Sequence, residues 1–202
     1  YGGSKILAEW FMGRDPQTLL NSSGKLRALE LGAGAVGLIG AVLTQKVGAD
    51  VVWTDRQAAA MVPLQMNLAL NDIVNPTVER FNYIVDDPVA WANGRVFDLI
   101  AFNADAILFK VDDVEARGKE ENEPDLGLAV MLRALTSLLT EGGRVMVGVG
   151  EYHELIPTFW EEAKTAGFRV TRVGDKEGRA IQDARYPAKK EFGVVRMVYT
   201  KN

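Results

Sequence analysis

A glycine-rich stretch, "LELGAGAVG" over residues 29–37, is where residue types and spacing most clearly suggest chemistry. Its glycines follow the G-x-G-x-x-G pattern, which in α/β proteins forms a tight turn between a strand and a helix. Gly32 and Gly34 let the backbone approach a ligand, and the helix that follows offers free N–H groups. Asp55 closes the next apolar run, where its carboxylate can accept hydrogen bonds from ribose hydroxyls. We therefore expect a cofactor that contains adenosine.

The choice between two such cofactors, NAD and S-adenosylmethionine (SAM), turns on Glu30. This residue stands two places before the first glycine of the turn, at the end of the expected strand and beside the space a cofactor would enter. There a carboxylate would repel the pyrophosphate of a dinucleotide but favour the ammonium and sulfonium cations of SAM. The alternative is a structural hydrogen bond made by Glu30 inside the protein. We expect the carboxylate to face the ligand, which favours SAM.

The elements that must position these residues alternate between strand and helix patterns. Strand patterns occupy residues 27–31, 50–54, 77–85, 97–103 and 144–150. Helix patterns occupy residues 4–12, 36–47, 126–139 and 155–166, and a further helix is expected with Pro63 in its first turn. This alternation predicts an α/β fold, doubly wound, with a mostly parallel sheet and helices on both faces. The last two apolar segments, 168–173 and 192–200, predict an antiparallel pair at one edge of a seven-stranded sheet.

Composition excludes several classes of function. A chain of 202 residues with 48% hydrophobic residues is expected to form a single domain, 1–202. The net charge of −4 argues against a nucleic-acid partner, and no apolar run has the length of a membrane span. Without cysteine, and with His153 as the only histidine, thiolate nucleophiles, a metal site and a serine–histidine triad are not expected. We expect a monomer, because the surface is evenly and mildly acidic, in a cytoplasmic or nuclear setting.

Several stretches together resemble one enzyme family. "LELGAGAVG" followed by "VVWTD" is similar to motifs I and II of the class I, seven-β-strand, SAM-dependent methyltransferases. "YGGSKILAEW", "NLALN", Trp91 and "FNAD" resemble, in the same order, stretches of the eukaryotic protein-lysine branch, whose members methylate chaperones and elongation factors. The resemblance covers essentially the whole chain. It implies SAM as cofactor and a protein lysine as methyl acceptor.

The resemblance also assigns roles to individual residues. It implies that Gly32, Ala33 and Gly34 line the methionine part of SAM and that Asp55 holds the ribose. Further contacts to the cofactor are assigned to Tyr1, Trp91 and Ala104: Tyr1 stands where the family has tryptophan, Trp91 packs near the adenine, and Ala104 offers its backbone. Asp105 is the expected catalytic residue, because a carboxylate can orient a lysine amine that must lose a proton. For Trp91 the alternative is a core aromatic, and for Asp105 a helix cap.

Two other functions stay open. The chain could methylate small molecules or a protein N-terminal amine, or it could be a non-catalytic methyltransferase-like module. Leu108 stands where the branch has tyrosine, and the acidic stretch 112–125 is longer than usual there, which keeps the last alternative open.

Overall fold

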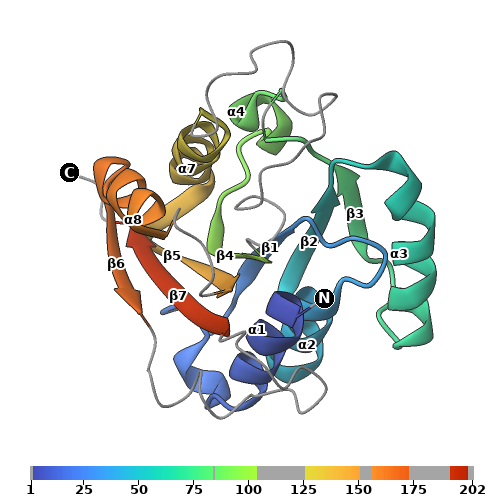
Figure 1. Ribbon diagram of the computed structural model, residues 1–202. Coiled ribbons are helices and arrows are strands. Elements are labelled where there is room, and N and C mark those ends of the chain that lie inside the picture. Colours follow the sequence, from blue (N-terminus) through green and yellow to red (C-terminus); the bar gives the residue numbers. More distant parts are fainter. Residues whose placement is uncertain (1, 84, 104–125, 151–155, 173–191, 200–202) are drawn as a thin grey trace, which may run out of the picture.

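The computed structural model describes residues 2–83, 85–103, 126–150, 156–172 and 192–199. Seven strands form one sheet in the order β3-β2-β1-β4-β5-β7-β6 (Figure 1). The strands are β1 (Arg27–Leu31), β2 (Asp50–Asp55), β3 (Thr77–Arg80), β4 (Phe97–Asn103), β5 (Leu139–Gly150), β6 (Phe168–Arg172) and β7 (Phe192–Tyr199). The helices are α1 (Gly2–Met12), α2 (Leu38–Val47), α3 (Ala58–Leu70), α4 (Pro88–Ala92), α7 (Leu126–Leu138) and α8 (Ile156–Thr165), with a 3-10 turn, η1, over Pro16–Thr18.

The pairing of the strands confirms the predicted mixed sheet. Strands β1 to β5 pair in parallel, whereas β7 runs antiparallel to both β5 and β6. Strand order reverses at β1, whose two neighbours are β2 and β4. In open α/β sheets, ligands bind beyond the carboxyl ends of the strands at such a reversal. The glycine turn, which follows β1 directly, therefore lies where a ligand is expected.

Two apolar layers cover the sheet, one on each face. Alternate residues of β1 point to opposite faces, so Ala28 belongs to one layer and Leu29 and Leu31 belong to the other. The layer around Ala28 contains the buried side chains of α1, α2 and α3. The second layer contains those of α4, α7 and α8. Each helix thus buries one face against the sheet, which leaves the carboxyl ends of the strands to the connecting turns.

Some boundaries differ from the sequence prediction. Helix α3 begins at Ala58, so Pro63 lies inside it and not in its first turn as predicted. Strand β3 ends at Arg80, five residues before the predicted end, and the short helix α4 was not predicted. No helix among the described residues is long and apolar enough to cross a membrane.

Candidate functional site

The turn between β1 and α2 has the backbone that its glycines predicted. Gly32 has φ 65° and Gly34 has φ 59°, a left-handed conformation that side chains disfavour. A Cβ atom placed on either glycine would meet no atom within 4 Å. These two glycines are therefore required by the backbone and face open space, which leaves room for a ligand against the turn. The Ala33 N–H donates to the Thr54 carbonyl at 2.9 Å and ties the turn to β2.

Asp55, at the end of β2, lies directly beside the turn. Its Oδ2 accepts a hydrogen bond from the Gly34 N–H at 2.9 Å, and its Oδ1 accepts one from the Gln57 N–H at 2.8 Å. The structure thus brings together four of the predicted residues, Gly32, Ala33, Gly34 and Asp55. A carboxylate has about four acceptor positions, so Asp55 keeps capacity for a further donor. Its contact with ribose hydroxyls stays a prediction.

Glu30 does not face this open space. It shares a face of β1 with Ala28, on the side of α2, and it is only 3% exposed. Its Oε2 accepts from the Gly40 N–H at 2.7 Å and its Oε1 from the Ile39 N–H at 3.3 Å, both in the first turn of α2. The prediction that this carboxylate faces the methyl donor is therefore wrong, and the alternative of a structural hydrogen bond is correct.

The surroundings of Glu30 also change its acidity. Burial raises the pKa of Glu30 to about 7, although the hydrogen bonds from Gly40, Ile39 and the Trp53 side chain act to lower it. Burial dominates because a charge in an apolar interior loses its hydration. Glu30 is consequently a buried support for the start of α2, and the identification of the cofactor cannot rest on it.

Trp53 and Gly40 complete this support and were not predicted as part of the site. The Trp53 indole N–H donates to the Gly37 carbonyl at 3.3 Å. A Cβ atom on Gly40 would lie 2.4 Å from the Trp53 Nε1, so only glycine allows α2 to pack this closely on β2. A glycine inside an apolar helix is the sequence signal that indicates such close packing.

The "NLALN" stretch of α3 contributes a further support. The Asn67 side-chain amide donates to the Ala35 carbonyl, in the turn between β1 and α2. Leu64 and Leu68, which flank Asn67 on the inner side of α3, are 0% and 1% exposed. The stretch therefore fixes α3 on the sheet and holds the far side of the glycine turn.

Trp91 has the contacts of a core aromatic. Its ring stacks on Phe81, with centroids 4.2 Å apart, and lies 6.4 Å from Phe97, the first residue of β4. The stack runs from Phe81, which follows the carboxyl end of β3, to Phe97 at the amino end of β4. The Arg95 guanidinium lies over the same ring at 4.9 Å. A contact between Trp91 and adenine stays a prediction, and these neighbours favour the structural alternative.

The segment that follows β3 lies beside Asp55, in the region where Trp91 was expected to contact the cofactor. The Phe81 N–H donates to the Asp55 carbonyl at 3.1 Å. The chain therefore leaves the sheet after β3 right beside the end of β2. Tyr83 follows in this segment; burial raises the pKa of its hydroxyl, and the Arg56 charge acts to lower it. Tyr83 was not singled out from the sequence, because the predicted strand 77–85 included it, whereas β3 ends at Arg80.

Three predicted site residues lie outside the described part of the chain. They are Tyr1, Ala104 and Asp105. Their roles stay predictions, as does the identification of Asp105 as the catalytic residue.

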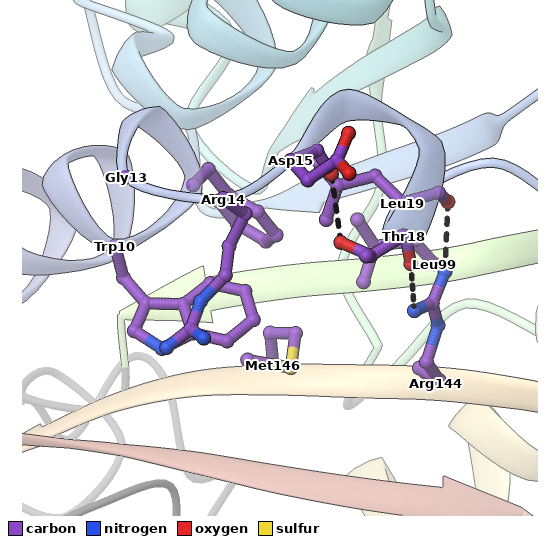
Figure 2. Close-up of a pocket in the computed structure, with 10 residues that line it drawn as sticks. Trp10, Gly13, Arg14, Asp15, Thr18, Leu19, Leu99, Arg144 and Met146 are labelled. Atoms are coloured by element: carbon purple, nitrogen blue, oxygen red, sulfur yellow. Dashed lines mark hydrogen bonds between the residues drawn. The ribbon is translucent and has the colours of Figure 1, made fainter.

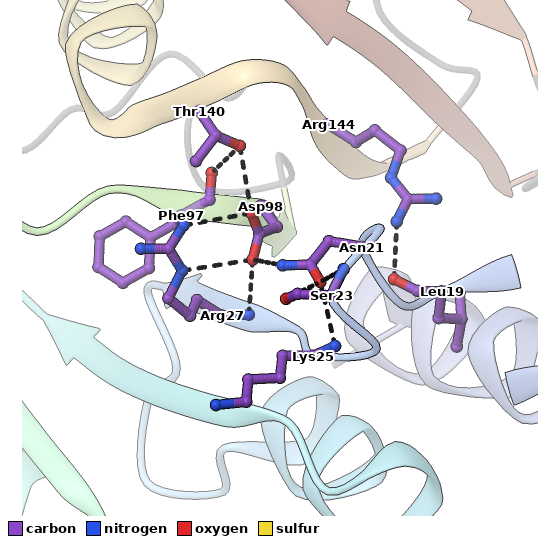
Figure 3. Close-up of polar contacts among 9 residues, drawn as sticks. All are labelled: Leu19, Asn21, Ser23, Lys25, Arg27, Phe97, Asp98, Thr140 and Arg144. Atoms are coloured by element: carbon purple, nitrogen blue, oxygen red, sulfur yellow. Dashed lines mark hydrogen bonds and ion pairs between the residues drawn. The ribbon is translucent and has the colours of Figure 1, made fainter. Parts of the chain in front are cut away.

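A polar cluster at the opposite end of the strands fixes the amino ends of β1 and β4 (Figure 3). The Asp98 carboxylate accepts hydrogen bonds from the Arg27 N–H at 3.0 Å, the Asn21 amide at 3.1 Å and the Thr140 hydroxyl at 3.3 Å, and it pairs with the Arg27 guanidinium. Burial acts to raise the pKa of Asp98, but the hydrogen bonds and the charge of Arg27 outweigh burial and lower it. These contacts are internal, which indicates a structural role.

A cavity of about 360 Å³ also lies toward the amino ends of the strands (Figure 2). Trp10 and Arg14 line one side, with the guanidinium 4.4 Å from the indole ring, and Leu99 and Met146 form the floor on the sheet. Arg144 closes one end by donating to the Thr18 and Leu19 carbonyls at 3.1 and 2.8 Å. Gly32, Ala33, Gly34, Asp55 and Trp91, the predicted cofactor residues that line the open turn or were expected near it and that the structure describes, do not line this cavity, so it is distinct from the glycine turn.

Comparison with known proteins agrees with the geometry of the site. A family model described as "Lysine methyltransferase" matches residues 3–112, more than half of the chain, and this range includes β1, the glycine turn, β2 and Asp55. No curated protein matches the sequence.

Solved structures share the fold at low sequence identity. A TehB-like SAM-dependent methyltransferase from Corynebacterium glutamicum is 19% identical, with 100% of this chain and 88% of that chain covered and a TM-score of 0.63. A magnesium protoporphyrin IX methyltransferase from Synechocystis with bound SAM is 16% identical, with 98% of this chain and 78% of that chain covered and a TM-score of 0.64. A ribosomal protein L11 methylase from Lactobacillus delbrueckii is 18% identical, with 98% of this chain and 77% of that chain covered and a TM-score of 0.61.

The residues present fit SAM as the cofactor. Open space faces Gly32 and Gly34, and the Asp55 carboxylate stands beside it. Together with the family match and the shared fold, this identifies a class I methyltransferase that uses SAM. The chain therefore belongs to the lysine methyltransferase family.

Proposed function

We propose that this protein transfers a methyl group from SAM to a lysine side chain of a protein. The observation that carries the proposal is the lysine methyltransferase family model, which matches residues 3–112. That range includes the glycine turn and Asp55, which together form the candidate cofactor site. The acceptor was also expected from the resemblance to the protein-lysine branch.

The residues of the site have separate tasks in this reaction. SAM, when bound, supplies a methyl carbon that is already activated for displacement. The glycine turn and Asp55 hold the cofactor, and Asp105 orients the lysine amine and accepts the proton that it loses. Holding the two reactants in line can contribute roughly 7–11 kcal/mol to the rate acceleration. Asp105 has this role by resemblance, since it lies outside the described residues.

The same resemblance proposes the class of acceptor. Members of the protein-lysine branch methylate chaperones and translation elongation factors, so abundant cytoplasmic proteins of these two classes are the first acceptors to test. Leu108, in the position where the branch has tyrosine, is the departure in the sequence that bears on the acceptor.

The proposal is tested by incubating the protein with methyl-labelled SAM and a cell lysate, followed by separation according to mass. We expect label in one or a few proteins, and digestion should place it on lysine. The Asp105→Asn variant is the matched control: it should bind SAM as the wild type does, measured by isothermal titration, and transfer little or no label.

Other outcomes separate the remaining alternatives. Label found only in small molecules, or on a protein N-terminus, would replace lysine as the acceptor. SAM binding without any transfer to the lysate would favour a non-catalytic module. Full turnover by Asp105→Asn would remove the catalytic assignment while leaving the acceptor unchanged.

A further inference from the structure

The outer side of α3 exposes large apolar side chains in a regular row. Val62, Met66 and Leu70 are 63%, 62% and 80% exposed, and Val74, just beyond the helix, is 81% exposed. The first three are spaced four residues apart, so they form one ridge along the helix. We refer to these four residues as the α3 ridge. Scattered apolar residues are common on protein surfaces, whereas a contiguous apolar row marks an interaction surface.

The inner side of α3 is apolar as well, and it is already packed. Leu64 and Leu68 are buried in the layer that covers Val51 and Trp53. No residue of α3 is charged. Gln65 and Asn67 are its polar residues, and a helix with apolar residues on two sides normally packs against a partner on both. In this protein α3 lies at the outer margin of the molecule beside β3, the edge strand of the sheet, so only its inner side is covered by described residues (Figure 1).

We propose that the α3 ridge is a dimer interface, on which a second copy of this chain packs its own α3 through a two-fold axis. Ridges of residues spaced by four interdigitate with ridges of the same spacing, and this is the commonest class of helix packing. A two-fold interface requires one surface to match itself. Val62, Met66 and Leu70 meet this requirement, because they are spaced by four and no residue of α3 carries a charge that would meet a like charge across the axis.

The size of the surface agrees with a dimer. Four large side chains at these exposures present on the order of 500 Å² per copy, and a symmetric contact doubles this to on the order of 1,000 Å², the lower limit for a specific interface. Ala58, Ala59, Pro63 and Ala69 are also exposed on α3 and extend the apolar surface around the ridge. A monomer was expected because the surface was taken to be evenly and mildly acidic, whereas the outer side of α3 exposes large apolar side chains and no charge.

Sedimentation velocity of the whole chain from low to high micromolar concentration tests the proposal. We expect the wild type to sediment as a dimer at the higher concentrations and Met66→Glu to remain a monomer throughout. Val89→Glu is the matched control, because Val89 is 62% exposed, as Met66 is, but lies on α4. This control should dimerise like the wild type.

A second variant protects the test against misfolding. Leu70→Lys places a charge of the opposite sign on the same ridge and should also give a monomer. Circular dichroism and SAM binding should be unchanged in all three variants, because none of the substituted residues belongs to the cofactor site. The proposal is overturned by a wild type that stays monomeric over the whole range, or by folded Met66→Glu and Leu70→Lys proteins that still dimerise. It is equally overturned if Val89→Glu dissociates the dimer as they do.

Discussion

Replacing Glu30 with glutamine tests the physical role that the structure gives to this residue. Glutamine keeps the size of the side chain but cannot ionise, so it removes the buried titratable group at the start of α2. In the wild type, that group accepts hydrogen bonds from the Ile39 and Gly40 N–H groups and has a pKa raised by burial from 4.5 to about 7. The stability of the protein should therefore depend on pH in a way that the variant does not.

The sign and size of this dependence follow from the two pKa values. Between pH 4.5 and about 7 the folded protein keeps a proton on Glu30 that the unfolded chain releases. Folding is then favoured by acid, so the stabilisation is fully present below pH 4.5 and is lost as the pH rises to about 7. At 1.36 kcal/mol per pKa unit, the total loss is about 3 kcal/mol. The free energy of unfolding of Glu30→Gln, relative to that of the wild type, should rise by this amount from acid to alkaline pH.

Urea unfolding followed by circular dichroism at about pH 5, 6, 7 and 8 measures this difference, most of which should develop within that range. Glu161→Gln is the matched control, because Glu161 is an exposed residue of α8 with a side chain 72% accessible. Its difference from the wild type should be nearly constant over the same range. If the difference between Glu30→Gln and the wild type were equally constant, Glu30 would not be the buried, titrating group described above.

Three further predictions concern the turn and the sheet. Gly40→Ala should lower the melting temperature, at a cost of about 1–3 kcal/mol, because its Cβ would lie 2.4 Å from the Trp53 Nε1; Gly32→Ala, at φ 65° and without a clash, should cost only about 1–2 kcal/mol. Equal melting temperatures for Gly40→Ala and the wild type would contradict the close packing. Asp55→Asn should weaken SAM binding about tenfold in calorimetry, through the loss of a charged acceptor, and an unchanged affinity would remove Asp55 from the site. Asp98→Asn should destabilise the protein by about 1–3 kcal/mol at neutral pH; because the pKa of Asp98 is lowered from 3.8, this loss should shrink as the pH falls below that value, and a constant loss in acid would argue against the ionised carboxylate.

The strands and the glycine turn could be predicted because their signals are local. An apolar run such as residues 97–103 has few alternatives to a buried strand, and the left-handed conformation at Gly32 and Gly34 follows from what glycine alone adopts freely. The start of helix α3 was predicted too late in the chain, because proline is most common in the first turn of a helix and Pro63 was therefore assigned to that turn. Here the proline lies on the exposed side of a helix that already starts at Ala58, so its missing N–H is tolerated in mid-helix.

The orientation of Glu30 could not be predicted, because it depends on which helix packs against its face of β1, and that is set by the tertiary fold and not by the local sequence. Strand alternation puts Glu30 on the same face as Ala28, but only the path of the chain after the turn decides which helix covers that face. Once α2 returns to that side, the carboxylate meets the Ile39 and Gly40 N–H groups. These are the donors that, at the start of such a helix, bind the pyrophosphate of a dinucleotide in other α/β folds. In this protein an internal carboxylate already uses them from beneath the turn, so Glu30 supports the start of α2 and does not itself contact the ligand.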